Sequence, residues 1–351
     1  MIPNTELKKL HDLIKNANNP LYLFDDDPDG LCSFLILWRS TKKGNGIALK
    51  GHPEKEIIQK NLRHTHDLLV ILDKPILKDE ALEDVSIPIV YLDHHPINEL
   101  EKKNLFYFNP RFENPLDDLP TSYWAYKAMH SDLWLSAIGT ISDWHIPDYI
   151  HEIQKEFPDI FTKINDPGEA NFDSPFGILS KSYLFAMKGK NQETNKLIKI
   201  LTRIDSPYEI LNQTTSQGKL IYSHYEELNK KYQKVLETAS QSIEEDQFLV
   251  YIYPSSQDSF TSIISNEIVY RNQNKIIIIA RIKGEKANLS LRTWLLNIPP
   301  IVSRALEGIN GSGGGHKHAC GAVIKSEDLH LFINNFKKYC LEELNKKQQN
   351  S

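Results

Sequence analysis

The stretch FDDDPDG, residues 24–30, places four aspartates directly behind the apolar run LYLF of residues 21–24. A short, continuous apolar run is typical of a strand buried on both faces of a parallel sheet. Carboxylates crowded this closely repel one another, so their grouping at a strand end gives the chain no stability of its own. A bound cation would remove the conflict, and further ligands are therefore expected at the ends of the neighbouring strands.

Two more apolar runs, LLVIL at 68–72 and IPIVYL at 87–92, predict strands of the same sheet. The intervening stretch LCSFLILWRSTKK, residues 31–43, predicts a helix, and two further helices are expected at 122–131 and 134–143. Strands that alternate with helices indicate an α/β fold with a parallel sheet.

Every predicted strand of this sheet leads into acidic or histidine side chains. The residues that follow the three strands are Asp25, Asp27 and Asp29, then Asp73, then Asp93, His94 and His95, and Asp143 lies at a predicted helix end. The carboxyl ends of parallel strands meet at one edge of the sheet, where ligands bind. Carboxylates mixed with imidazole favour a pair of divalent cations, with Mn²⁺ preferred and Mg²⁺ as an alternative. Asp26 is expected to be a helix cap or a solvated neighbour.

Length and composition limit the classes of protein that fit. A chain of 351 residues with 40% hydrophobic and 25% charged residues is typical of a globular protein with two domains. The net charge of −5 provides no overall basic field for nucleic acid, so such contacts must be local or made through metal. Three scattered cysteines, no signal-like start and no membrane-length apolar run predict a cytoplasmic protein without membrane contact.

The chain divides into three predicted parts. These are a metal-binding domain at 1–185, a helical connector at 186–245 and a smaller α/β domain at 246–351. The connector is rich in Lys, Glu, Gln and Tyr with periodic apolar positions, which is typical of long amphipathic helices. Strands of the last domain are expected at 248–254, 275–282 and 286–294.

A phosphate-binding surface is expected in the last domain. Gly313, Gly314 and Gly315 precede His316, and such a glycine run favours an anion-binding nest of backbone N–H groups. Ser290 and Arg292 alternate along a predicted strand and therefore face the same side, as a fork for phosphate would require.

These motifs resemble those of the DHH phosphoesterase superfamily. DDDPDG at 25–30 fits its D-x-D-x-D-G signature, YLDHHP at 91–96 contains its name-giving triplet, and VILD at 70–73 and IGTISD at 138–143 resemble its second and fourth motifs. GSGGGHKHACGA at 311–322 resembles the GGGHxxAxG motif of the DHH-associated C-terminal domain of RecJ-like nucleases and nanoRNases.

The resemblance implies a role for each matching residue. One metal ion would be held by Asp25, Asp27 and Asp73, and a second by Asp29, His94 and Asp143, with Asp73 bridging the two. Catalytic roles would fall to Asp73, Asp93, His94 and His95, with Asp93 a weak ligand or a partner of the following histidine and His95 near the scissile phosphate. Substrate phosphate would be bound by Ser290, Arg292, the three glycines and His316, with Arg111 near the site. Lys74 departs from the small residue common at its position; it is expected to face solvent, with a contact to phosphate as the alternative.

The function implied is a two-metal, Mn²⁺-dependent phosphodiesterase with its substrate between two lobes. The leading hypothesis is an exonuclease of DNA repair type that releases mononucleotides from single-stranded DNA or RNA, with 3′→5′ polarity favoured. A nanoRNase or cyclic-dinucleotide phosphodiesterase and a catalytically silent replisome scaffold remain alternatives; a pyrophosphatase fits the glycine motif less well. The connector helices are a possible docking site for a helicase or replisome protein, and a homodimer is a further possibility.

Overall fold

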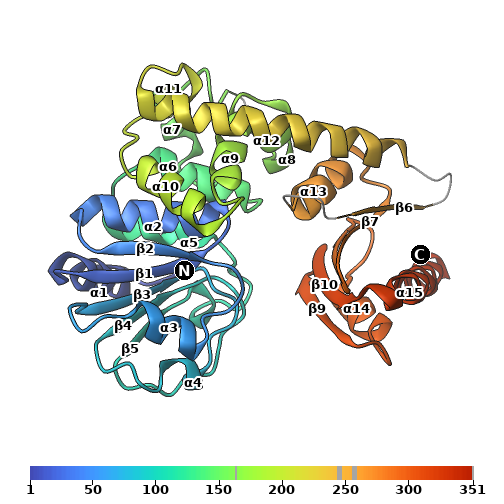
Figure 1. The fold of residues 1–351 in the computed structure, drawn as a ribbon, viewed down its shortest axis with the longest axis horizontal. Coiled ribbons are helices and arrows are strands. Elements are labelled where there is room, and N and C mark those ends of the chain that lie inside the picture. The colour runs from blue at the N-terminus through green and yellow to red at the C-terminus, as the bar shows by residue number, and fades with distance from the viewer. Residues whose placement is uncertain (163, 243–246, 255–258, 350–351) are drawn as a thin grey trace. The chain divides into compact units, whose positions relative to one another are not determined.

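The computed structural model describes residues 1–162, 164–242, 247–254 and 259–349, which belong to two units, residues 1–226 and 227–351 (Figure 1). The elements that begin in the first unit are α1 (Asn4–Asn16), β1 (Pro20–Asp25), α2 (Pro28–Thr41), β2 (Asn45–Leu49), α3 (Lys55–Asn61), β3 (Leu68–Leu72), α4 (Asp79–Leu82), β4 (Ile89–Leu92), β5 (Leu105–Phe108), η1 (Pro110–Phe112), α5 (Thr121–Met129), α6 (Leu133–Ser142), α7 (Ile150–Glu156), α8 (Pro167–Asp173), α9 (Phe176–Ala186), α10 (Asn191–Leu201), α11 (Pro207–Leu211) and α12 (Ser216–Gln241). The second unit contains β6 (Phe248–Pro254), α13 (Thr261–Arg271), β7 (Ile276–Lys283), β8 (Lys286–Arg292), α14 (Pro299–Ala305), β9 (Gly311–His316), β10 (Ala319–Lys325), η2 (Ser326–Asp328) and α15 (Leu329–Gln349).

The sheet of the first unit has the strand order β2-β1-β3-β4-β5, and every neighbouring pair is parallel. The predicted parallel α/β fold and its three apolar strands are therefore confirmed. Two strands were not predicted, β2 and β5, and both lie at the edges of the sheet.

Helices cover both faces of this sheet (Figure 1). Side chains alternate along a strand, so Tyr22 and Phe24 of β1 face one core with α1, α2, α5 and α6, while Leu21 and Leu23 face a second core with α3 and α4. All four side chains are fully buried. This double burial explains why the strand is a continuous apolar run, and it leaves only the strand ends for polar groups.

The turn from β1 into α2 fixes the first three aspartates of the FDDDPDG stretch. The N-cap of α2 is Asp27, whose side chain accepts a hydrogen bond of 2.9 Å from the backbone N–H of Gly30. A Cβ on Gly30 would lie 2.7 Å from the backbone nitrogen of Asp25, so only glycine permits this close approach. Asp26, expected to be a helix cap or a solvated neighbour, is not the cap; its backbone N–H donates to Asp25 Oδ1 at 2.8 Å.

The region predicted as a connector is divided between the two units. Leu197, Ile198 and Leu201 of α10 are buried in the core of the first unit. Helix α12 runs through the boundary at residues 226 and 227. The amphipathic pattern of 186–245 therefore arises mainly because its helices pack on the two units.

The second unit is built on a mixed sheet of order β6-β7-β8-β10-β9. Ala287, Leu289 and Leu291 of β8 pack in a core with α14 and α15, whereas the alternate side chains of the strand face α13. The glycine run forms β9, an extended edge strand paired antiparallel with β10. The glycine run, for which an anion-binding nest was expected, thus continues the sheet as its exposed edge strand.

The described residues include neither a membrane-spanning helix nor a disulfide bond. Among these residues, no helix combines the length and apolar character needed to cross a membrane. All three cysteines, Cys32, Cys320 and Cys340, are buried and have free thiols.

Candidate metal centre

Three groups of side chains that could hold a metal ion occur in the described part of the chain, and all lie at the carboxyl ends of strands of the first sheet or at the end of α6. They are Asp25 with Asp27 and Asp73, Asp29 with His94 and Asp143, and Asp73 with His94 and His95. Within each group the donor atoms lie within 4.8 Å of one another. The structure thus brings together all six residues predicted as ligands, although they span 119 positions of sequence, from 25 to 143.

Asp73 lies at the centre of this cluster. It is 1% exposed, and its Oδ1 lies 3.4 Å from His94 Nε2 and accepts a hydrogen bond of 3.2 Å from the Thr121 hydroxyl. Burial alone would raise the pKa of this carboxyl, but the contacts with the two histidines, His94 above all, lower it. Its φ of 58° is left-handed, a conformation that Asp and Asn adopt more readily than most residues.

Asp29 binds the N-terminus of α5. Its two carboxylate oxygens accept backbone hydrogen bonds of 2.8 Å from Thr121 and 2.9 Å from Ser122, and the Ser122 hydroxyl also donates to it. The N-cap of α5 is Pro120, which makes no side-chain capping bond. Asp29 therefore caps this helix from a distant part of the sequence, which fixes its position and offsets part of the effect of burial on its pKa.

His94 is oriented by backbone groups. Its Nδ1 lies 2.8 Å from the carbonyl oxygen of Asp118, so its Nε2 faces the acidic cluster, 3.7 Å from Asp143 Oδ2. Arg111, which was expected near the site, donates from Nε to the carbonyl oxygen of His94 at 2.7 Å. Asp118 also contacts His145 Nε2 at 3.1 Å.

Asp93 contacts the second histidine of the triplet. Its Oδ1 lies 2.8 Å from His95 Nδ1 and its Oδ2 accepts the His95 backbone N–H at 3.0 Å. Asn109 completes the arrangement by donating to the carbonyl oxygen of His95 at 2.9 Å. Asp93 is fully buried and belongs to none of the three groups, so the structure places it as the partner of His95.

Lys74 does not face solvent, and this expectation was wrong. The side chain is 1% exposed, and its Nζ donates to Asp25 Oδ1 at 2.7 Å and to the carbonyl oxygen of Leu49 at 3.0 Å. A buried lysine needs such partners because an unpaired charge is too costly to remove from water. Asp25, which was expected to bind a metal ion, thus already has Lys74 as a cationic partner.

The electrostatics of the cluster fit a divalent cation. Burial and the neighbouring charges of Asp73 and Asp143 raise the pKa of Asp29 to about 8. Burial also raises the pKa of Asp25 to about 6, against the effect of Lys74, and raises that of Asp27 well above its ordinary range. Carboxyls that resist ionisation through mutual repulsion become stable anions when a cation joins them. The donor set of carboxylates and imidazole suits Mn²⁺ or Mg²⁺.

Sequence reasoning missed several residues of the site because their partners are distant in sequence. These residues are Lys74, Asn109, Asp118, Thr121, Ser122 and His145. One signal was available in the sequence. Pro120 precedes the helix that begins at Thr121, and proline has no side-chain acceptor for the first backbone N–H groups of a helix. These N–H groups therefore require an acceptor from another part of the chain.

In the second unit, the predicted phosphate fork points towards α13. Arg292 donates from Nε to Asn266 at 2.6 Å and from Nη1 to the carbonyl oxygens of Leu291 and Cys320 at 2.9 and 3.0 Å. The Ser290 hydroxyl is buried 2.7 Å from that of Ser265. Gly313, Gly314, Gly315 and His316 are exposed along β9.

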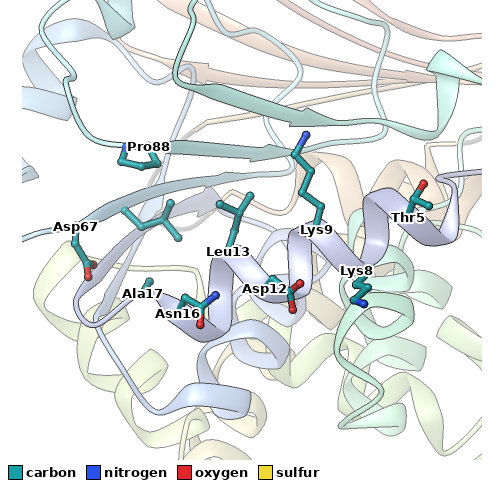
Figure 2. A pocket seen from close by; sticks show the side chains of 10 residues that line it. Thr5, Lys8, Lys9, Asp12, Leu13, Asn16, Ala17, Asp67 and Pro88 are labelled. Atoms are coloured by element: carbon teal, nitrogen blue, oxygen red, sulfur yellow. The ribbon is translucent and has the colours of Figure 1, made fainter.

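An open groove lies at the other end of the first sheet. It has a volume of about 500 Å³ and is lined by α1 together with Asp67, Leu68 and Pro88, at the amino ends of β3 and β4 (Figure 2). None of the three candidate ligand groups, which are those found among the described residues, includes a residue of this groove. The candidate ligand groups therefore lie at the opposite, carboxyl ends of the strands.

Comparisons with known proteins agree with this architecture. Residues 246–342 match the DHHA1 domain family. RecJ from Thermus thermophilus, in complex with Mn²⁺, is similar with a TM-score of 0.70 at 14% identity over 97% of this chain and 55% of that one. The exonuclease RecJ bound to manganese gives a TM-score of 0.64 at 16% identity over 96% of this chain and 95% of that one.

A pGpG-specific phosphodiesterase, PggH from Vibrio cholerae, gives a TM-score of 0.52 at 14% identity over 94% of this chain and 99% of that one. The chain spans about half the length of the Thermus RecJ. No curated protein sequence matches it. At these identities the likeness establishes the fold, a RecJ-type DHH architecture.

Proposed function

We propose that this chain is a divalent-metal-dependent phosphodiesterase that acts on the ends of single-stranded nucleic acid. Its residues 246–342 match the DHHA1 domain family, and its fold as a whole is similar to that of RecJ. The observation that carries the proposal is the gathering of the acidic and histidine groups at one edge of the sheet. Release of mononucleotides in the 3′→5′ direction is the favoured form of this activity.

The candidate ligands are assigned to two metal ions, with Mn²⁺ preferred. Asp25, Asp27 and Asp73 would hold one, and Asp29, His94 and Asp143 the other, with Asp73 shared. When bound, divalent ions in such a site supply charge to a phosphate and lower the pKa of water. The chain holds several ligands in place beforehand: the start of α5 positions Asp29, the carbonyl oxygen of Asp118 positions His94, and the Thr121 hydroxyl donates to Asp73.

His95 is assigned the contact with the scissile phosphate. Burial lowers the pKa of its imidazole, but the Asp93 carboxylate more than offsets this and the pKa is raised. A protonated ring whose Nδ1 is fixed by Asp93 can donate from Nε2 to a phosphate oxygen. Arg292 and the exposed glycines of β9 are assigned to the binding of substrate phosphate in the second unit.

Exposed apolar side chains follow the carboxyl ends of three strands, and they support a substrate that carries bases. Ile76, Ile97 and Phe112 are each 40% or more exposed, and they lie in the segments that follow β3, β4 and β5. The ring of Phe112 packs on Tyr107 with 5.0 Å between centroids, and the Tyr107 hydroxyl accepts from the Asn98 backbone at 3.4 Å. Exposed aromatic faces near a phosphate site are suited to stacking with nucleobases.

Phe112→Ala is expected to weaken the binding of oligonucleotides by about tenfold, because one stacking contact is lost. Hydrolysis of bis(p-nitrophenyl) phosphate, which carries no base, should be unchanged. The matched control is Leu331→Ala, since both side chains are 52% exposed but Leu331 lies on α15 of the second unit. Equal losses on both substrates, or none on either, would contradict the assignment of these side chains.

The function is tested by digestion of end-labelled DNA and RNA of graded length, from two to twenty nucleotides, with and without Mn²⁺. Stepwise shortening of the twenty-nucleotide strand from one end supports the exonuclease, and the position of the label gives the polarity. A complete lack of hydrolysis on every length would contradict the proposal and favour the silent-scaffold alternative.

A second candidate function is the hydrolysis of short oligonucleotides or cyclic dinucleotides. The likeness to PggH over 99% of that chain favours it, and so does the net charge of −5, which provides little attraction for a long polyanion. In the same digestion series, a marked preference for the dinucleotide over the twenty-nucleotide strand would select this activity.

A further inference from the structure

Lys74 is a buried cation within the candidate metal centre. It follows Asp73 directly, its side chain is 1% exposed, and its Nζ lies 2.7 Å from Asp25 Oδ1. Lysine is rarely buried unless it is paired, and here its partner is a member of the group Asp25, Asp27 and Asp73. The positive charge of Lys74 therefore lies beside one of the two positions at which the proposed function requires a metal ion.

The position of this charge is fixed on several sides. The Tyr91 hydroxyl donates to the Lys74 carbonyl oxygen, and the carbonyl oxygen of Leu49 accepts from Nζ. The Tyr91 ring is itself buried and stacked on Tyr107 with 4.3 Å between centroids. The ammonium group is thus held at the ends of β1 and β2 and has no exposed surface through which to leave.

The other group of ligands, Asp29, His94 and Asp143, has no comparable lysine among the described residues. In the described part of the chain, the ion pairs place no lysine or arginine on Asp29 or Asp143. Asp29 instead accepts hydrogen bonds from neutral donors, the backbone N–H groups of Thr121 and Ser122 and the Ser122 hydroxyl. Neutral donors hold a carboxylate without repelling an incoming cation.

We propose that Lys74 makes the two ligand groups unequal, so that Asp25, Asp27 and Asp73 bind a divalent ion more weakly than Asp29, His94 and Asp143. A fixed positive charge within a few ångströms repels a divalent ion, and the repulsion is stronger in a partly buried site than in bulk water. The inference rests on the proposed function, because it concerns the same metal centre. In this proposal Lys74 is a positioning residue. Its ammonium group fixes the Asp25 side chain and lowers the affinity of that ligand group, so that one of the two ions exchanges readily.

The test is a titration of the full chain with Mn²⁺ at pH 8, in which free Mn²⁺ is measured by electron paramagnetic resonance. The wild-type protein should show two classes of site that differ at least tenfold in affinity. In Lys74→Met the weaker class should gain at least tenfold while the stronger class is unchanged. Lys74→Arg, which keeps the charge, should behave like the wild type.

Thermal melting provides a second measurement for the case in which Lys74→Met folds poorly. Without its partner, Asp25 is a partly buried and uncompensated carboxylate, so Mn²⁺ should raise the melting temperature of this variant more than that of the wild type. Two wild-type classes of equal affinity, or a weaker class that Lys74→Met leaves unchanged, would overturn the inference while leaving the metal centre intact. A wild-type protein that binds no Mn²⁺ would overturn both the centre and the inference.

Discussion

Replacing Asp73 by asparagine is expected to abolish Mn²⁺-dependent hydrolysis, with a loss of about a thousandfold or more. Asp73 belongs to two of the three candidate ligand groups, as His94 does, and it contacts both His94 and Thr121. Asparagine keeps the shape of the side chain and tolerates the left-handed φ of 58° at this position. The loss should therefore come from the missing charge, and the fold should be retained.

Two further variants make this result specific. Asp26→Asn changes an aspartate of the same crowded stretch that belongs to no ligand group, and it should keep near-normal turnover. Asp73→Ala should lose activity as Asp73→Asn does but also melt at a lower temperature, because alanine adopts a positive φ only at a cost of about 1 kcal/mol. Near-normal turnover of Asp73→Asn with Mn²⁺ would show that the centre has been placed on the wrong residues.

The sequence was sufficient for the middle of the first sheet but not for its edges. β1, β3 and β4 are buried on both faces, and this burial imposes the continuous apolar runs from which they were predicted. β2, with the sequence NGIAL, is an edge strand with a partly exposed pattern, so its composition resembles that of a turn followed by a short apolar segment. Only its pairing with β1 makes it a strand.

The same distinction applies to the candidate site. Residues that follow a buried strand, such as Asp25 and Asp73, could be placed together because parallel strands have their carboxyl ends at one edge. The residues that contact these aspartates could not be predicted in this way. Lys74 contacts Asp25 across 49 positions, and Thr121 contacts Asp29 across 92, and no local pattern encodes such pairs. The role of a lysine beside an acidic cluster depends on burial, which sequence alone leaves open.

The stability of the metal-free protein is expected to fall as the pH rises from about 4 to about 8. Asp25 and Asp29 have ordinary pKa values of 3.8, and burial with like-charged neighbours raises these to about 6 and about 8 in the folded state. A carboxyl with a raised folded pKa keeps a proton that the unfolded chain has released, so its stabilising effect is lost as the pH passes the folded pKa. His94 and His95, whose pKa values are also raised against the effect of burial, act in the same direction.

Mn²⁺ should reverse this trend, because metal and protons compete for the same carboxylates. Each proton displaced on binding makes the apparent affinity about tenfold higher per pH unit. Melting curves at pH 6 and pH 8, with Mn²⁺ or with a chelator, should therefore show a larger stabilisation by metal at pH 8. In Asp29→Asn, whose side-chain oxygen can still accept from Thr121, the difference between the two pH values should shrink. An equal rise in melting temperature at both pH values would mean that the ion binds away from these buried acids, and the electrostatic basis of the centre would then fail.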